Sequence, residues 1–235
     1  MNGILKVARF QLRDQRNAIV IFYGIIISLA TMAVIAMRRD TTGNSSIGGL
    51  GLTSVIFIFI LGLNCFTTAF KFMQANNVSR RRFFIANVLA LSAISLFLAL
   101  VDTTLGSILS RVVTYSGMTE QLYGTVSVVP EILWSFTFAT LAAHVGWLIS
   151  MIYYRSNKLQ KIVVSLSPLV ALMAGLYFNR RTAGAFGTSI TRFLGTVLGL
   201  LNGRNPYIAS LSFAVASAIT AGLCFMLVRR APVKD

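Results

Sequence analysis

The chain has 235 residues, of which 56% are hydrophobic and 11% are charged, whereas a soluble domain carries about a quarter charged residues. The 21 Lys and Arg residues outnumber six Asp and Glu residues, which gives a net charge of +15. A mean hydropathy of +0.76 leaves no polar surface on which this charge could bind nucleic acid. We therefore interpret the basic residues as signals of membrane topology and predict an integral membrane protein.

Residues 1–17 predict an amphipathic helix that lies in the cytoplasmic interface. At a helical repeat, Lys6, Arg9, Arg13 and Arg16 share an arc of about 80°, and apolar residues occupy the opposite arc. The apolar run that follows is longer than a signal-peptide core, and no A-x-A cleavage site closes it. A simple positive flank for the first span is the alternative interpretation.

Six apolar stretches are long enough to cross a membrane, because about 20 helical residues cover the roughly 30 Å of hydrocarbon. They are residues 18–37, 52–70, 83–109, 132–154, 162–179 and 206–228. Such continuous runs lack the alternation of barrel strands. The predicted fold class is therefore an all-α integral membrane protein, with a single domain of six transmembrane helices over 18–235. Pro206 suits the first turn of the last span, and Asn205 suits its N-cap.

Residues 182–203 are apolar and rich in glycine, but Arg192 divides them into two pieces of about ten residues. Neither piece is long enough to cross the membrane alone. We expect a re-entrant or interfacial pair of short helices before the last span. A seventh span is the alternative.

The distribution of Lys and Arg predicts the orientation of the chain. With six spans, 14 of these residues fall on the side of the two termini and seven on the other side. The positive-inside rule then places both termini in the cytoplasm. Asn77 and Asn157 are expected on the inner side, and Ser45 and Thr119 on the outer side.

The motifs of common catalytic sites are missing from the sequence. There is no G-x-x-x-x-G-K-[ST] motif for ATP. One histidine and two separated cysteines, Cys65 and Cys224, do not suit a usual metal site or a disulfide framework. Ser189 lacks the pattern of a nucleophile elbow. We expect a protein that is not an enzyme and that binds no metal or cofactor of its own.

The short polar segment between spans two and three has local signals for a tight turn. Residues 71–84 have the sequence KFMQANNVSRRRFF. Asn76 and Asn77 suit a turn, including a positive φ, and Ser79 suits the N-cap of the helix that begins with the arginines. The loop therefore joins two spans through very few residues.

In this segment the chain resembles the permease subunits of ABC-2 type transporters. In that family a short turn, often Gly-hydrophobic-Ser-Arg-basic-x-Phe-Phe, forms a coupling helix that docks on a separate ATPase. Here Asn77 replaces the usual glycine, and Val78 is expected to supply an apolar contact. The resemblance gives the coupling residues as Asn77, Val78, Ser79, Arg80, Arg81 and Arg82. A positive-inside anchor is the alternative role of the three arginines.

The resemblance also covers the basic N-terminus, the six spans and the interrupted segment before the last span. It implies a half-size permease in a bacterial plasma membrane that forms the pathway of an ABC exporter with a second copy or a homologous permease. ATP and Mg²⁺ would bind only to the partner ATPase, and the cargo would be a hydrophobic or amphipathic peptide, antimicrobial or lipid. Small residues in the last span suit either self-association or internal packing: Ala214, Ala216, Ser217, Ala218, Ala221 and Gly222. A non-transporting immunity or sensor protein and an ion-coupled secondary transporter remain as alternatives.

Two ionisable residues fall within predicted spans. A carboxylate in lipid costs about 2.5–3.5 kcal/mol on insertion scales, so Asp102 should face the bundle, water or an arginine such as Arg111. We expect His144 to be a hydrogen-bonding group between helices. A transport or gating role is the alternative for both residues. Glu131 follows Pro130 and is expected to be a first-turn acid favoured by the helix dipole.

Overall fold

The computed structural model describes residues 3–39, 47–182, 184–201 and 203–229. Apart from one short parallel pair, β1 (Ile47–Gly48) with β2 (Tyr115–Ser116), the regular elements of this part of the chain are helices. Six helical segments within it are long and apolar enough to cross a membrane. The predicted all-α fold with six candidate spans is thereby confirmed.

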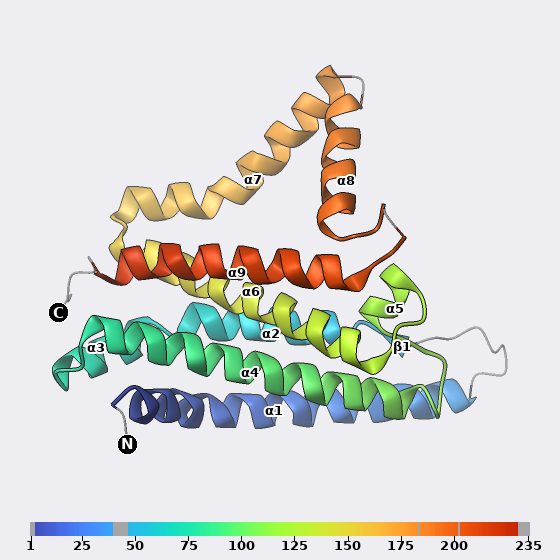
Figure 1. Ribbon diagram of the computed structural model, residues 1–235, viewed down its shortest axis with the longest axis horizontal. Helices are drawn as coiled ribbons and strands as arrows, with labels where there is room; N and C mark the ends of the chain where they lie inside the picture. Colours follow the sequence, from blue (N-terminus) through green and yellow to red (C-terminus); the bar gives the residue numbers. More distant parts are fainter. Residues whose placement is uncertain (1–2, 40–46, 183, 202, 230–235) are drawn as a thin grey trace.

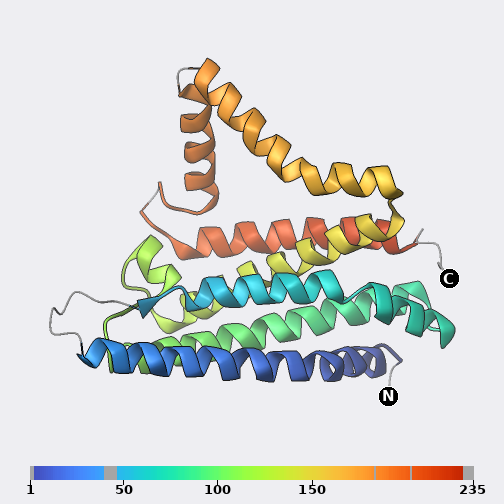
Figure 2. The same cartoon turned by 180° about the vertical axis from the view of Figure 1, so that it is seen from behind.

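The main body is a bundle of roughly aligned helices (Figures 1 and 2). It consists of α1 (Gly3–Arg39), α2 (Leu50–Asn64), α3 (Thr67–Ala75), α4 (Arg80–Leu109), α6 (Val128–Arg155) and α9 (Pro206–Arg229). Arg80 Nη1 donates a hydrogen bond to the carbonyl oxygen of Arg229 at 2.8 Å, and a Cβ on Gly3 would lie 3.8 Å from Arg82 Nη1. Both described ends of the chain therefore lie beside the α3–α4 turn, at what we call the terminal end of the bundle.

The far end of the bundle carries the strand pair and α5 (Met118–Tyr123) (Figure 1). Asn77 and the α6–α7 junction at Asn157 lie at the terminal end, whereas Thr119 lies in α5 and is buried. Asn77 and Asn157 thus lie at the opposite end of the bundle from Thr119, as expected if two spans, α4 and α6, separate Asn77 from Asn157. Ser45 lies outside the described residues.

The helix expected over 1–17 does not end before the first predicted span. From Gly3 onward, α1 runs unbroken for 37 residues, or about 55 Å at 1.5 Å per residue. No glycine or proline between Ile4 and Tyr23 breaks the helical hydrogen bonds. The first half is amphipathic, but its apolar side packs along the bundle: Val7 and Ala8 are buried, while Lys6 and Arg13 are exposed.

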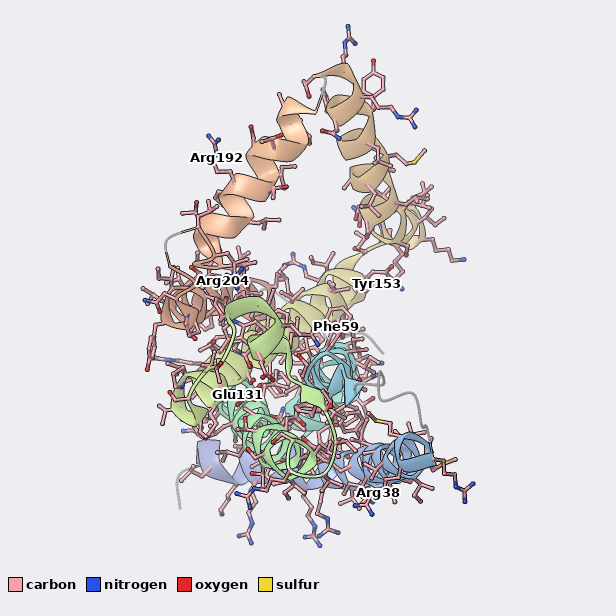
Figure 3. The ribbon with its side chains drawn as sticks, turned by 90° about the vertical axis from the view of Figure 1, so that its right-hand side faces the viewer. Arg38, Phe59, Glu131, Tyr153, Arg192 and Arg204 are labelled. Atoms are coloured by element: carbon pink, nitrogen blue, oxygen red, sulfur yellow. The ribbon has the colours of Figure 1, made fainter. Side chains whose placement is uncertain are left out.

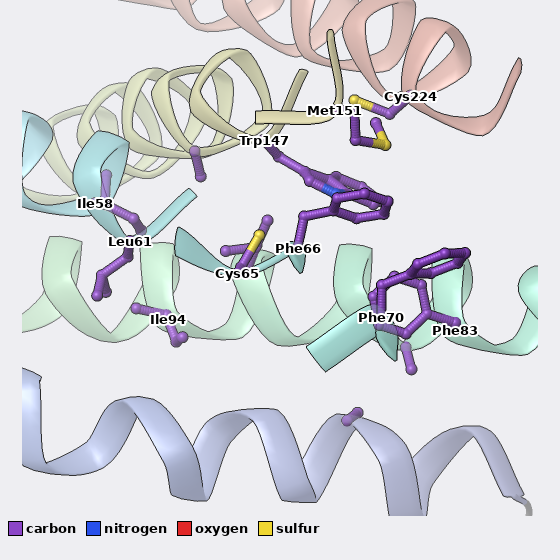
Figure 4. Close-up of a cluster of buried hydrophobic side chains, with 14 of the residues drawn as sticks. Ile58, Leu61, Cys65, Phe66, Phe70, Phe83, Ile94, Trp147, Met151 and Cys224 are labelled. Atoms are coloured by element: carbon purple, nitrogen blue, oxygen red, sulfur yellow. The ribbon is translucent and has the colours of Figure 1, made fainter. Parts of the chain in front are cut away.

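The second predicted span, 52–70, is not one helix, because the chain bends at Cys65 and Phe66 between α2 and α3. The bend directs Phe66 into the core, where its ring centroid lies 4.9 Å from that of Phe70 and 5.3 Å from that of Tyr154 (Figure 4). The side chain of Phe66 is fully buried. Burial of this aromatic cluster thus stabilises the break in the helix.

Two glycines allow α2 and α6 to cross with their backbones in contact. A Cβ on Gly62 would overlap the carbonyl oxygen of Ala143, and a Cβ on Gly146 would overlap that of Phe59. Figure 3 looks at the bundle from the far end and shows Phe59 on α2. Small residues permit such close approach between helices in a membrane.

An arm formed by α7 (Lys158–Arg181) and α8 (Ala185–Val197) leaves the bundle (Figures 1 and 2). None of the described side chains of α7 is buried. With 13 residues, α8 is about 20 Å long and too short to cross a membrane. The expected pair of short helices in 182–203 is wrong in number, because the described residues of this segment form only α8. Gly199 and Gly203, at φ 65 and 84, instead lead the chain to α9 through a loop.

Candidate functional site

The turn between α3 and α4 is closed by a defined set of backbone hydrogen bonds. Asn76 caps α3, and Asn77 follows in the left-handed conformation with φ 56. The N–H of Asn77 donates to the carbonyl of Gln74 at 3.0 Å, and the N–H of Val78 donates to that of Met73 at 3.0 Å. This pattern is a Schellman motif. The positive φ predicted for this segment is therefore confirmed at Asn77.

The next two residues connect this motif to α4. Val78 is half-buried and packs against the core, as an apolar residue after a Schellman motif commonly does. A charged substitution at Val78 would therefore disturb folding together with any docking. Ser79 Oγ accepts a hydrogen bond from the N–H of Arg82 at 3.4 Å, which confirms the predicted N-cap.

The three arginines that open α4 have different surroundings. Arg80 is half-buried, and its bond to the Arg229 carbonyl satisfies a backbone acceptor at the end of α9. Arg81 and Arg82 are exposed. The structure therefore gives Arg80 a role in packing and leaves Arg81 and Arg82 available to a partner at the terminal end.

Aromatic side chains join this turn to the rest of the bundle. The ring of Phe70 on α3 lies 5.6 Å from that of Phe83 on α4 and 6.1 Å from that of Tyr154 on α6, centroid to centroid. Phe70 and Phe83 are fully buried (Figure 4). Because the turn is short and its flanking helices pack on the same cluster, a force on the turn would be transmitted to α6 with little slack.

The left-handed conformation of Asn77 leads to a stability prediction. We expect Asn77→Val to lower the free energy of unfolding by about 1–2 kcal/mol, because a β-branched residue is strained at positive φ. Asn77→Gly should be neutral or stabilising. Thermal unfolding of the detergent-purified variants measures both effects. Asn76→Val is the control, since φ is −92 at this exposed neighbouring position. An equal loss at both positions would contradict the explanation.

The far end of the bundle holds the carboxylate of Asp102. The hydroxyl of Tyr23 on α1 donates to Asp102 Oδ1 at 2.9 Å and lies 3.3 Å from the carbonyl oxygen of Leu98. The suggested partner Arg111 is wrong: this residue lies exposed beyond the end of α4. A phenol from the neighbouring helix, and not a guanidinium, donates a hydrogen bond to the carboxylate.

Asp102 lines a small polar cavity of about 30 Å³, together with Ser54, Thr103 and Glu131. Glu131, labelled in Figure 3, lies in the first turn of α6 as expected. The hydroxyl of Thr103 has no hydrogen-bond partner among the described residues. A volume of this size holds about two water molecules, so it is too small for an organic cargo.

Tyr115 also lines this cavity and lies in β2, outside the candidate spans. Burial, followed by the negative charges of Glu131, Asp102 and Glu120, raises the pKa of its phenol to about 12. The phenol is therefore protonated at neutral pH and able to donate a hydrogen bond. Within the described ranges no three His, Cys, Asp or Glu residues lie close enough to hold a metal ion.

His144 lies away from this cavity, in the contact between α6 and α9. Its Nδ1 is 2.7 Å from Ser217 Oγ, which confirms the predicted hydrogen bond between helices. The side chain is 2% exposed, and its Nε2 has no partner in the part of the chain that the structure describes. His144 does not line the cavity of Asp102, so the structure does not bring the two intramembrane ionisable residues together.

Sequence reasoning missed Tyr23 and the glycine pair at the α2–α6 crossing. Tyr23 is one of three hydroxyl residues in its predicted span, with Ser28 and Thr31, and nothing in the sequence distinguishes it from the other two. Gly62 and Gly146 each lie inside a predicted span, but a single sequence does not show that two such glycines meet. Both features depend on which helices are neighbours.

Comparison with known proteins finds no matching family model, no similar curated protein and no similar solved structure. The inference of function therefore rests on the arrangement of this chain and on the resemblance of its turn. The α3–α4 turn is the best candidate for a functional site, because it combines a rigid backbone with exposed basic side chains.

Proposed function

We propose that the protein is a half-size permease subunit of an ABC exporter and that a separate ATPase drives it. The observation that supports this proposal is the α3–α4 turn, a Schellman motif followed by an N-cap, with Arg81 and Arg82 exposed beside it. We infer that this terminal end of the bundle faces the cytoplasm, in agreement with the excess of basic residues. There the turn would meet an ATPase that binds ATP and Mg²⁺.

In this mechanism the turn transmits movement of the ATPase to the bundle. A push on the turn displaces α3 and α4 together, since four residues separate the two helices. The aromatic cluster connects the displacement to α6, and the hydrogen bond from Arg80 to Arg229 connects it to α9. A single contact at the membrane surface would therefore act on most of the bundle.

The proposal includes a second copy of the chain or a homologous permease. The arm extends away from α9 (Figure 1), and the described residues of α7 bury no side chain. On α9, Ala214, Ala218 and Gly222 are exposed at intervals of four residues, which suits close contact with another helix. A pathway between two copies would carry a hydrophobic or amphipathic peptide, antimicrobial or lipid.

Charge reversal in the turn tests the proposal. We expect Arg81→Glu to reduce the Mg-ATP hydrolysis that co-purifies with the tagged protein by about tenfold, because an exposed charge that contacts a partner contributes about 1.4 kcal/mol or more. Hydrolysis is measured in reconstituted membranes with and without orthovanadate. Thermal stability of the variant should be unchanged.

The matched control is Arg38→Glu, which reverses an exposed arginine at the far end of α1. This variant should keep full hydrolysis. Full hydrolysis in Arg81→Glu would exclude the turn as the coupling element. If the unmodified protein, purified from its native membranes, carries no hydrolytic activity, the exporter proposal is wrong.

A further inference from the structure

A cavity of about 480 Å³ lies near the terminal end of the bundle, between α1, the α2–α3 bend and α4. Its apolar lining includes Phe10 and Phe72, whose rings stack with centroids 5.1 Å apart, and Ile94. Figure 4 shows Ile94 on α4 and Cys65, which also lines the cavity, at the α2–α3 bend. Cavities of about 300–1,000 Å³ are typical of small-molecule sites.

The polar part of the lining is unusual because carboxamides dominate it. Gln11, Gln15, Asn64 and Asn87 all line the cavity. No Lys or Arg among the described residues does so, and Asp14 is the only acidic residue among those that line the cavity. The chain is strongly basic, yet this cavity presents neutral donors and acceptors.

Two of these carboxamides are buried without full hydrogen bonding. Gln11 is 6% exposed, and neither its Oε1 nor its Nε2 has a partner among the residues described. Asn87 is 1% exposed, and its Nδ2 makes a weak contact with Cys65 Sγ at 3.5 Å. A buried polar group left unpaired costs about 1–3 kcal/mol. A ligand with complementary groups would remove this cost.

We propose that the cavity binds an uncharged amphipathic molecule whose head carries amide or hydroxyl groups. A carboxamide offers both a donor and an acceptor, so it pairs well with a neutral head of the same kind. An anionic head would find no cation in the lining. A cationic head would find one exposed carboxylate, that of Asp14, directly beside Arg13. The apolar chain of the ligand would lie along Phe10, Phe72 and Ile94.

This inference goes beyond the proposed transport function and does not depend on an ATPase. The test uses the full chain in nanodiscs of phosphatidylcholine, with radiolabelled decanamide as the probe. We expect saturable binding of about one molecule per chain above the background of empty nanodiscs. Unlabelled decanamide should displace the probe at least tenfold better than decanoate or decylamine, which have the same chain length but a charged head.

Gln11→Leu should weaken decanamide binding at least tenfold while thermal stability stays equal or rises, because the change removes an unpaired buried amide. Asn64→Leu, at an exposed position of the lining, should weaken binding severalfold and serves as a second variant. Gln121→Leu, at the far end, is the control and should bind normally.

Binding no greater than in empty nanodiscs would overturn the inference, as would equal displacement by decanoate. Unchanged affinity in both Gln11→Leu and Asn64→Leu would also overturn it. Because the assay contains no ATPase, a failure of the exporter proposal would leave these outcomes unaffected.

Discussion

Replacing Gly62 with alanine is expected to destabilise the protein by about 3 kcal/mol, or to prevent folded protein from accumulating. The added Cβ would overlap the carbonyl oxygen of Ala143, which is a backbone atom and cannot rotate away. Relief requires α2 and α6 to separate, which would loosen the packing around Trp147 and Ile58, both fully buried. Thermal unfolding followed by size-exclusion chromatography should show a midpoint lowered by roughly 10 °C.

Gly24→Ala is the matched control for this prediction. Gly24 also lies within a candidate spanning helix, but a Cβ there meets no atom within 4 Å. The substitution should leave stability unchanged or raise it slightly, since alanine is the better helix former. Gly146→Ala should resemble Gly62→Ala, because its Cβ would overlap the carbonyl of Phe59. Similar midpoints for Gly62→Ala and Gly24→Ala would show that the close crossing is not needed.

Phe66→Ala is expected to cost about 3–5 kcal/mol, the range for removal of a buried aromatic side chain. Its ring lies between those of Phe70, Phe83 and Tyr154, at centroid distances of 4.9, 6.1 and 5.3 Å. The loss should appear in the same thermal assay. If the turn couples to an ATPase, the variant should also have reduced co-purifying hydrolysis at temperatures where it remains folded, because only the Phe70–Tyr154 ring contact would then join α3 to α6 in this cluster.

Phe193→Ala removes the same side chain from α8, where it is 67% exposed, and should have little effect on either measurement. Phe66→Leu should fall between Phe66→Ala and the unmodified protein, because leucine fills part of the volume. A Phe66→Ala variant as stable as Phe193→Ala would mean that the aromatic cluster does not hold the bend between α2 and α3.

The features that the sequence predicted correctly are those with local causes. The number of spans follows from the length of apolar runs. The left-handed Asn77 and the cap at Ser79 follow from the chemistry of neighbouring residues. The sequence did not show that the helix expected over 1–17 continues into the first span and packs along the bundle, because amphipathicity does not tell whether a helix lies in the interface or along another helix. In α1, burial of Val7 and Ala8 against the bundle favours the second arrangement.

The features that could not be predicted join residues far apart in the chain. Tyr23 and Asp102 are separated by 79 positions. Gly62 and Gly146 are separated by 84 positions, since 146 − 62 = 84, and their contact depends on which helices become neighbours. The carboxamide cavity draws on α1, the α2–α3 bend and α4, and its residues have no common motif. The sequence predicted the α3–α4 turn of the candidate site. It could not predict that Arg80 bonds to the end of α9, because this contact depends on where α9 lies in the bundle.

The alignment of α1 with α4 has a consequence for the surrounding bilayer. Tyr23 contacts Asp102, 79 positions later, and Leu98, 75 positions later, and Gly3 lies near the side chain of Arg82, 79 positions later, so α1 and α4 run side by side at an offset of about 75–79 positions. Arg9 and Arg16 therefore lie near the depth of residues 84–88 and 91–95 on α4, where Leu89 is 47% exposed. One side of the bundle is charged at a depth where the other is apolar. If the hydrocarbon core reaches this depth, lipid beside α1 would have to thin, or its headgroups would have to tilt inward, to follow these arginines, whereas lipid beside α4 would not. The hydrophobic mismatch with the membrane is thus expected to differ between the α1 side and the α4 side of the bundle.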